Sequence, residues 1–323
     1  MENQAIDSAQ APLVSVIVPT CNRPLFLRRA LASIQAQTYR PLEIVLVDDN
    51  VADSPAQLQT QDIARPFQEA GLLQYIRTEG RIGGGAARNL AVRAATGAYL
   101  AFLDDDDCYL PEKIERQLAF MREHALDMCF QDVKWLHADG RLAEHRRNDF
   151  VRDFSQQNLL RQHILRPIAP TAIYMLRREA FDRTQGFGEV RIGQDYLLML
   201  GCIEAGLCIG YMPGAYVHQY LHDGERISLG HNKIQGENAL YALRQQYFHL
   251  LDRAERRYVR FRHYAVLAFA CWRSRMYARA IGYAVRAALT SPAQCLREAK
   301  RFFAGQDERA ALNDESGARC PDV

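Results

Sequence analysis

Strand-like and helix-like segments alternate along the first 125 residues of this 323-residue chain. Short apolar runs rich in Val, Ile and Leu are separated by longer stretches that begin or end at Pro, Gly or Asn. The predicted strands cover residues 14–18, 42–47, 73–76 and 99–103, and the predicted helices cover 24–37, 55–70 and 83–97. This alternation is typical of an α/β fold, with a mainly parallel sheet flanked by helices.

Aspartates follow two of the predicted strands at the point where each strand ends. Asp48 and Asp49 follow the second strand, and four consecutive aspartates at 104–107 follow the fourth. Ligands of parallel sheets bind at the carboxyl ends of strands, so both groups are expected to border one cleft. Four adjacent carboxylates repel one another unless a cation neutralises them, and their hard oxygens suit Mg²⁺ or Mn²⁺. The plainer alternative is an acidic turn that caps the helix starting near Pro111.

The middle of the chain is less regular, and its C-terminal part has a helical pattern. Strands are predicted at 128–135 and 171–176, and helices at Arg178 and Gln194. Beyond about Lys233, apolar residues recur at helical spacing, namely Tyr258, Phe261, Ala265, Phe269, Trp272 and Met276. We expect disordered ends at 1–11 and 304–323, a catalytic domain at 12–232 with halves at about 12–125 and 126–232, and a helical C-terminal region at 233–303.

Composition narrows the classes of protein that the chain can belong to. The net charge is +2, and no apolar stretch is long enough to span a membrane. The chain has 8 cysteines but no CxxC pair, which argues against zinc sites and a disulfide framework. Because no secretion signal is present, we expect a cytoplasmic protein with reduced thiols.

Five motifs, in order, resemble those of family 2 glycosyltransferases. They are residues 16–23, 43–50, 83–89, 103–107 and 181–196. Each motif alone is modest, but five in order at plausible spacing are specific. The resemblance extends over residues 13–230 and implies a GT-A fold, in which a nucleotide-binding half, about 12–125, merges with an acceptor half.

The resemblance also implies the ligands and the residues that bind them. A nucleotide-diphosphate sugar, expected to be UDP-linked, would bind with Mn²⁺ or Mg²⁺. Asp104 would lie near the ribose and the metal, Asp106 would bind the metal directly, and His222 would complete the metal or diphosphate site. The run of four leaves open whether Asp104 and Asp106 or Asp105 and Asp107 face the ion. The expected nucleotide-binding residues are Pro19, Thr20, Asn22, Arg23, Asp48, Asp49, Gly84, Arg88, Asp104 and Asp105.

A glycine run at 83–85 suggests a place where the backbone comes close to a ligand. Arg88 lies one helical turn further on and could reach a phosphate. The alternative is a flexible loop with Arg88 on a solvated face. The glycines are contiguous and follow the third strand, so they do not form a dinucleotide-binding fingerprint.

Asp195 is the predicted general base. A carboxylate opposite the leaving group can take the proton of an acceptor hydroxyl during direct displacement, which inverts the anomeric centre. The pair that is usually Glu-Asp in the family reads Gln194-Asp195 here. We place Gln194, Phe187 and Gly186 on the acceptor side. A plain helix cap is the alternative role for Asp195.

The C-terminal helical region is basic. Residues 236–301 contain 13 Lys and Arg against 4 Asp and Glu. One interpretation is an amphipathic surface that makes peripheral contact with the inner face of an anionic membrane. The other is a helical cap on the catalytic domain with its arginines in water. No nucleic-acid module accompanies the charge, so nucleic acid is not an expected partner.

The leading hypothesis is an inverting, metal-dependent glycosyltransferase that acts on a glycan, glycolipid or glycoprotein acceptor in surface polysaccharide biosynthesis. One alternative is a catalytically silent relative that serves as a binding or scaffold subunit. Another is a sugar nucleotidyltransferase, which the absence of glycine from the loop at residues 19–23 disfavours.

Overall fold

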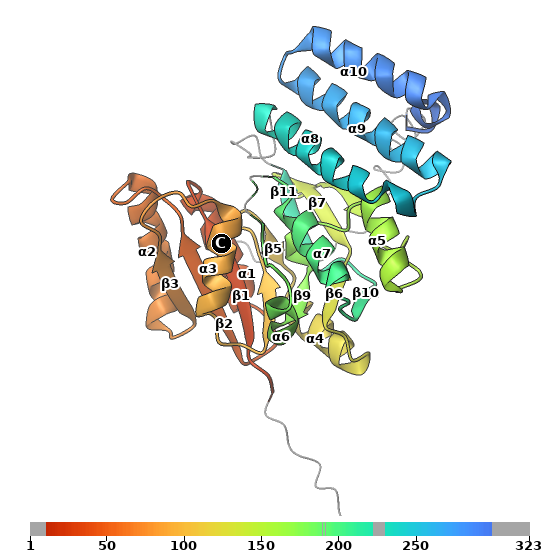
Figure 1. Cartoon of the computed structure of the whole chain (residues 1–323). Helices are drawn as coiled ribbons and strands as arrows, with labels where there is room; N and C mark the ends of the chain where they lie inside the picture. Colours follow the sequence, from red (N-terminus) through yellow and green to blue (C-terminus); the bar gives the residue numbers. More distant parts are fainter. Residues whose placement is uncertain (1–10, 189, 191, 222–229, 299–323) are drawn as a thin grey trace, which may run out of the picture.

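Figure 1 shows the computed structural model of the chain, which describes residues 11–188, 190, 192–221 and 230–298. A sheet with flanking helices forms the lower body, and helices stack above it. Most of the predicted disordered ends, 1–11 and 304–323, lies outside the described residues. Among these residues, no helix is long and apolar enough to cross a membrane.

A seven-stranded sheet runs through the lower body in the order β10-β6-β9-β4-β1-β2-β3, counted over the described residues. Its N-terminal half is parallel and matches the prediction. The strands are β1 (Val14–Thr20), β2 (Leu42–Asp48), β3 (Leu73–Arg77) and β4 (Tyr99–Phe102). The helices that connect them are α1 (Pro24–Gln35), α2 (Pro55–Glu69) and α3 (Gly84–Ala94).

The other half of the sheet is mixed. β9 (Met175–Arg177) runs antiparallel between β4 and β6 (Met128–Gln131), and β10 (Ile209–Met212) pairs in parallel with β6. The helices of this half are α4 (Lys113–Glu123), α5 (Gln156–Leu165), α6 (Arg178–Asp182) and α7 (Gln194–Glu204). A single turn of 3₁₀ helix, η1 (Thr171–Ile173), precedes β9, so the strand predicted at 171–176 is shorter than expected.

A second, smaller sheet was not predicted. It has the order β5-β11-β7-β8 and contains β5 (Cys108–Tyr109), β7 (Val133–His137), β8 (Leu142–Arg146) and β11 (Val217–Leu221). The strand predicted at 128–135 therefore breaks at Asp132 into β6 and β7, which belong to different sheets. Buried Asp132 stabilises the break, because its Oδ1 accepts hydrogen bonds of 2.8 Å from the Asn148 N–H and 2.9 Å from the Tyr211 hydroxyl.

The first strand and helix follow from the apolar pattern and from one proline. Val16, Ile17 and Val18 have no exposed surface, because helices cover both faces of the sheet. α1 begins at Pro24 as predicted, and Arg23 occupies the N-cap position. Asn22 has φ 59°, and its N–H donates to Asn50 Oδ1 at 2.6 Å. This bond joins the ends of β1 and β2.

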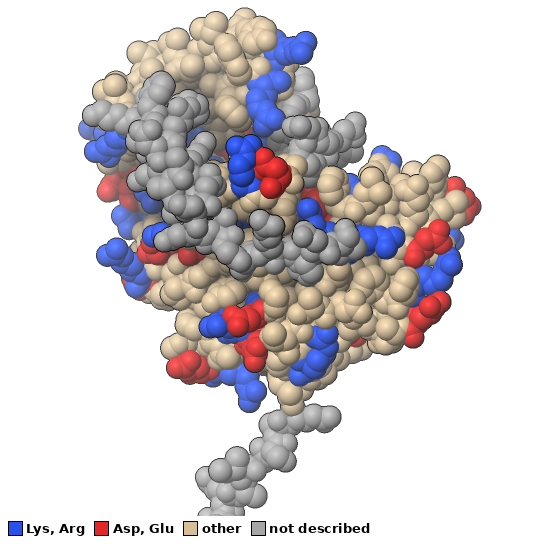
Figure 2. Space-filling view, turned by 180° about the vertical axis from the view of Figure 1, so that it is seen from behind, with Lys and Arg blue, Asp and Glu red and all other residues tan. Residues whose placement is uncertain are grey.

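The C-terminal part is helical, as predicted. It comprises α8 (Gly230–Gln246), the short 3₁₀ turn η2 (Phe248–Leu250), α9 (Arg253–Arg273) and α10 (Tyr277–Thr290). α9 packs between α8 and α10 and also touches α5. Buried Glu237 of α8 accepts a hydrogen bond from Arg244 at 3.5 Å and lies 3.2 Å from His263 of α9. α8 and α9 thus form a cap on the lower body. In Figure 2, blue Lys and Arg atoms lie at the edges of the tan surface of the upper, helical part.

Candidate active site

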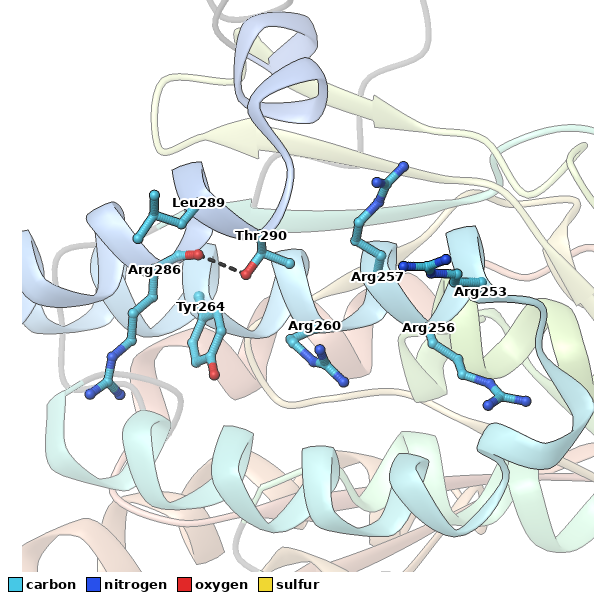
Figure 3. A pocket seen from close by; sticks show the side chains of 8 residues that line it. All are labelled: Arg253, Arg256, Arg257, Arg260, Tyr264, Arg286, Leu289 and Thr290. Carbon is cyan, nitrogen blue, oxygen red and sulfur yellow. Dashed lines mark hydrogen bonds between the residues drawn. The ribbon is translucent and has the colours of Figure 1, made fainter.

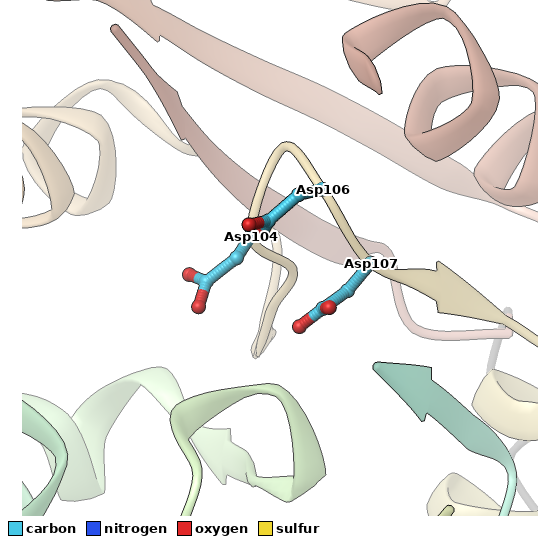
Figure 4. Close-up of side chains that lie close together, drawn as sticks. All are labelled: Asp104, Asp106 and Asp107. Atoms are coloured by element: carbon cyan, nitrogen blue, oxygen red, sulfur yellow. The ribbon is translucent and has the colours of Figure 1, made fainter. Parts of the chain in front are cut away.

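The four aspartates follow β4, and their side chains point to two different sides. Asp104, Asp106 and Asp107 have carboxylate oxygens within 4.8 Å of one another, and Figure 4 shows all three around one space. Asp105 is buried away from them and accepts a 2.8 Å hydrogen bond from Thr20 at the end of β1. Asp104, Asp106 and Asp107 thus share a side that Asp105 does not, and which pair of the run faces an ion stays a prediction.

Electrostatic repulsion at this cluster is strong. Burial raises the pKa of Asp107 well above its usual range, and the charges of Asp106 and Asp104 raise it further. Burial and then Asp106 raise the pKa of Asp105 to about 7, while Arg23 acts in the opposite direction. Gln219 of β11 donates to Asp107 at 2.6 Å. Three hard carboxylates gathered within reach of one ion fit a divalent cation such as Mg²⁺ or Mn²⁺.

Arginines from three places surround the aspartates. Arg23 donates to Asp106 at 2.6 Å and to Asp105 at 3.3 Å. Arg29 of α1 donates to the Asp106 carbonyl at 2.8 Å, and its guanidinium lies 3.6 Å from the centre of the Tyr220 ring. Sequence reasoning missed Arg29, and the only available signal was a basic residue in the second turn of the helix after β1.

Arg88 joins the aspartates to the start of α7. Its Nη2 forms an ion pair with Asp104, and its Nη1 donates to Gln194 Oε1 at 2.8 Å. These are its protein partners, and the predicted contact of Arg88 with a phosphate stays a prediction. The guanidinium therefore connects a nucleotide-half carboxylate with the residue next to Asp195.

The glycine run lets the two halves of the domain approach one another. A Cβ on Gly85 would lie 3.0 Å from the Gly188 carbonyl oxygen, and one on Gly84 would lie 3.3 Å from Gln194 Oε1. Both distances are tighter than normal packing. The close approach that the glycines permit is therefore to the α7 side of the domain, and contact of Gly84 with a nucleotide stays a prediction.

Asp48 and Asp49 are buried and already accept hydrogen bonds from the protein. Asp49 accepts from Thr78 at 2.9 Å and from two backbone N–H groups at 2.8 Å each, those of Ile82 and Gly83. Asp48 accepts from Asn50 and, at 2.5 Å, from the Tyr75 hydroxyl. These carboxylates fix the loops that lead into α3, and their predicted contact with the base or ribose stays untested.

Asp195 is the second residue of α7, which begins directly after Gly193, a residue with φ 90°. Its Oδ1 accepts a 2.8 Å hydrogen bond from the Tyr196 N–H. Burial raises the pKa of Asp195, and nearby Asp104 raises it as well, whereas the Tyr196 N–H and the charge of Arg88 oppose the rise. Asp195 is thus close enough to Asp104 and Arg88 for their charges to change its pKa.

The residues predicted on the acceptor side have packing roles in the structure. Phe187 is buried, with its ring 5.3 Å from that of Phe102 in an edge-to-face arrangement. Asn89 of α3 bonds both the N–H and the carbonyl of Phe187, at 2.9 and 2.8 Å. Gly186 has φ 64°, and a Cβ there would lie 2.6 Å from the Asn89 side-chain oxygen. These two residues therefore hold the segment before α7 against α3.

His222, the histidine predicted to complete the metal or diphosphate site, lies outside the described residues. His218 of β11 is buried, and burial lowers its pKa to about 4, so it is neutral near pH 7. The other predicted nucleotide-binding residues, Pro19, Thr20, Asn22 and Arg23, do lie together at the carboxyl end of β1, beside the aspartates.

The fold and this cleft define a class of protein, the nucleotide-diphospho-sugar transferases of GT-A type. The mannosyltransferase PcManGT from Pyrobaculum calidifontis, in complex with GDP-Man and Mn²⁺, is similar over 95% of this chain and 84% of its own, with a TM-score of 0.60 and 20% identity. S. aureus TarS in complex with UDP-GlcNAc is similar over 84% of this chain and 88% of its own, with a TM-score of 0.57 and 19% identity.

The family model "Glycosyl transferase family 2" matches residues 15–184, and the chain belongs to that family. An uncharacterized glycosyltransferase of Methanocaldococcus jannaschii is 34% identical over 41% of this chain and 45% of its own length. TuaG of Bacillus subtilis, provisionally named a teichuronic acid biosynthesis glycosyltransferase, is 33% identical over 40% of this chain and 50% of its own length. The chain thus spans about half the length of these curated relatives.

Proposed function

We propose that the protein is an inverting, metal-dependent glycosyltransferase that moves a sugar from a nucleotide diphosphate to an acceptor hydroxyl. The observation that supports this most is the position of Arg88, which bonds Asp104 and Gln194 at once. These two contacts connect the carboxylate cluster with the residue next to Asp195, which supports the proposal that both carboxylate groups face the donor sugar. Direct displacement at an anomeric carbon needs these two elements, one beside the leaving group and one beside the nucleophile.

Asp104 and Asp106 are the residues we propose as ligands of Mn²⁺ or Mg²⁺, and Asp107 lies close enough to join them. The donor set supports this assignment, because three hard carboxylate oxygens lie within 4.8 Å of one another. When bound, the ion supplies positive charge that stabilises the leaving diphosphate. Arg23 and Arg88 already contact the same carboxylates, and we propose that they orient the diphosphate there.

Asp195 is the proposed general base. Its raised pKa makes it a stronger proton acceptor than an ordinary aspartate. Among the hydrogen bonds of the described residues, only its Oδ1 is engaged, which leaves Oδ2 for the acceptor hydroxyl. Attack from this side, opposite the leaving group, inverts the configuration of the anomeric carbon.

For the donor and the acceptor we propose only a chemical class. We propose a UDP-linked donor, although the two similar structures contain UDP-GlcNAc and GDP-Man, so both nucleotides belong in any test. The proposed acceptor is a glycan, lipid-linked or protein hydroxyl in surface polysaccharide synthesis, which the name of TuaG supports. A cytoplasmic location with peripheral membrane contact through the C-terminal helices is part of the same proposal.

Nucleotide release with Mn²⁺ tests the proposal. Wild type, Asp195→Asn and the exposed control Asp182→Asn would be compared with UDP-GlcNAc and GDP-Man over a panel of simple glycan acceptors. We expect release by wild type and by the control, and a loss of about 100-fold or more in Asp195→Asn, the usual size of general-base effects. A silent scaffold, for which Gln194 in place of glutamate is the supporting feature, releases nucleotide in none of the three. A nucleotidyltransferase consumes or forms pyrophosphate instead.

A further inference from the structure

The chain contains no acidic residue between Glu255 and Glu298, while this segment carries nine arginines. It forms nearly all of α9 and the whole of α10. Among the described residues, no carboxylate pairs with Arg256, Arg257 or Arg260. The positive charge on these helices is therefore not neutralised locally, which favours an anionic partner.

A basic groove about 640 Å³ in volume lies between α9 and α10 (Figure 3). Arg253, Arg256, Arg257 and Arg260 line it from α9, and their spacing of three and four residues places them on one helix face. Arg286, Leu289 and Thr290 line it from α10, and Tyr264 lies on the α9 side. Five guanidinium groups around one groove repel one another unless anions bind among them.

An apolar ridge runs along the outer face of α10 and is defined by Tyr277, Ile281, Val285 and Leu289. These residues are four apart, and their exposed fractions are 50%, 59%, 52% and 79%. The opposite face of α10 packs on α9 through buried Ala280 and Ala287. Trp272, 58% exposed, lies beside Tyr277 with 5.1 Å between the ring centres. A continuous exposed apolar face of this kind marks an interaction surface.

The groove and the ridge form one surface, because Leu289 belongs to both. We propose that this surface binds an anionic phospholipid bilayer, with α10 lying flat in the interface. The ridge enters the boundary between headgroups and acyl chains, and the groove arginines bind lipid phosphates. Trp272 and Tyr277 are of the residue types that prefer this depth.

A bilayer fits the surface better than a protein partner. In a bilayer, the apolar layer and the anionic headgroup layer run side by side. The apolar ridge on α10 and the row of groove arginines on α9 and α10 also run side by side, so each can meet its matching layer. No acidic side chain lies between Glu255 and Glu298, so nothing in this segment repels a negative surface. A protein partner would not require such a complete lack of acidic side chains. In this proposal α8 and α9 pack toward the catalytic body while α10 faces the membrane, and the groove arginines bind lipid phosphates rather than water. The inference extends the proposed function, but vesicle binding does not depend on sugar transfer.

Co-flotation of the full-length protein with vesicles tests the inference. The vesicles would be pure phosphatidylcholine, or phosphatidylcholine with 30% phosphatidylserine as an order-of-magnitude anionic content. The test variants are Ile281→Ser/Leu289→Ser for the ridge and Arg256→Gln/Arg260→Gln for the groove. The matched controls are Leu58→Ser on α2, 51% exposed, and the exposed pair Arg93→Gln/Arg152→Gln. Circular dichroism checks that every variant is folded.

We expect wild type and controls to float with the anionic vesicles, and the groove variant to bind about 25-fold more weakly, about fivefold for each arginine. The ridge variant should lose at least about tenfold. The inference is overturned if wild type does not float with anionic vesicles, or if the test variants float as the controls do. It is also overturned if the ridge is buried in a dimer. In that case wild type would have the mass of a dimer in solution, and Ile281→Ser/Leu289→Ser would have the mass of a monomer. Equal binding of wild type and ridge variant to soluble polyphosphate but not to vesicles would likewise contradict it.

Discussion

Arg88 donates a 2.8 Å hydrogen bond to the side-chain oxygen of Gln194, which lies 106 residues further along the chain. The same guanidinium forms an ion pair with Asp104. One side chain of α3 thus connects the aspartates after β4 with the first residue of α7. Its two contacts hold the start of α7 next to the aspartates of the other half of the domain.

Replacing Arg88 by lysine should weaken this connection. Lysine keeps the positive charge but cannot donate two directed hydrogen bonds at the angle of a guanidinium. The loss of a partly buried, charge-assisted bond is expected to lower the free energy of unfolding by about 1–3 kcal/mol. Urea denaturation measures it, with Arg93→Lys as the control, because Arg93 is exposed on the same helix. Equal stability of the two variants would show that the Arg88 contacts contribute nothing to the fold.

Gly85→Ala should destabilise the protein because there is no room for the added methyl group. It would lie 3.0 Å from a backbone oxygen, that of Gly188, which cannot move aside alone. We expect a loss of about 1–3 kcal/mol. Gly282→Ala in α10 is the matched control, since nothing lies within 4 Å of its added Cβ. Alanine in that exposed helix should stabilise by about 0.5–1 kcal/mol, so changes of the same sign in both variants would contradict the packing argument.

Lys113 should make stability depend on pH in the alkaline range. It is fully buried, its Nζ has no hydrogen-bond partner among the described residues, and burial lowers its pKa from 10.5 to about 7. Between these two values the unfolded chain binds more protons than the folded one, so the free energy of unfolding rises with pH, by at most about 1.4 kcal/mol per unit. Below about pH 7, the amine is charged in both the folded and the unfolded chain, so the folded protein bears the full free-energy cost of the buried charge.

Lys113→Met tests this directly, because methionine fills a similar volume without a charge. The variant should be more stable than wild type at pH 7, and the difference should shrink toward pH 10. Denaturation curves from pH 6 to pH 10 measure it. A difference that stays constant over that range would mean that folding does not lower the pKa of Lys113.

The aspartate run should respond to manganese in a residue-specific way. Asp106→Asn removes a proposed ligand, so the rise in melting temperature that Mn²⁺ and UDP produce in wild type should shrink or vanish. Asp105→Asn changes a neighbouring carboxylate that faces Thr20 and Arg23 instead. It should lower the melting temperature of the free protein but keep the Mn²⁺-dependent rise. The reverse pattern would place the ion on the other side of the run.

The sequence was most informative where local pattern decides structure. The first four strands and three helices were predicted because continuous apolar runs end at Pro, Gly or Asp, and the carboxyl ends of those strands hold the aspartates. The break of β6 and β7 at Asp132 could not be predicted, because it depends on Asn148 and Tyr211 from distant segments. Short strands such as β5, whose two residues pair with β11, carry too few residues for a pattern.

For the candidate site too, the local sequence indicated individual residues but not their partners from distant segments. Motif positions indicated Asp104, Asp106, Arg88 and Asp195, but not which partners each would have. The pairing of Arg88 with Gln194 is set by the packing of α3 against α7, which two glycines permit. Arg29 and Gln219 belong to no local motif and become neighbours of the aspartates only through the fold.

The most direct test of the central claim is an anomalous difference map from crystals grown with Mn²⁺ and UDP. We expect one strong manganese peak within about 2.0–2.4 Å of carboxylate oxygens of Asp106 and Asp104, with the diphosphate on the side that faces Asp195. A manganese peak away from these residues, or a diphosphate bound where Asp195 cannot face the sugar, would contradict the account.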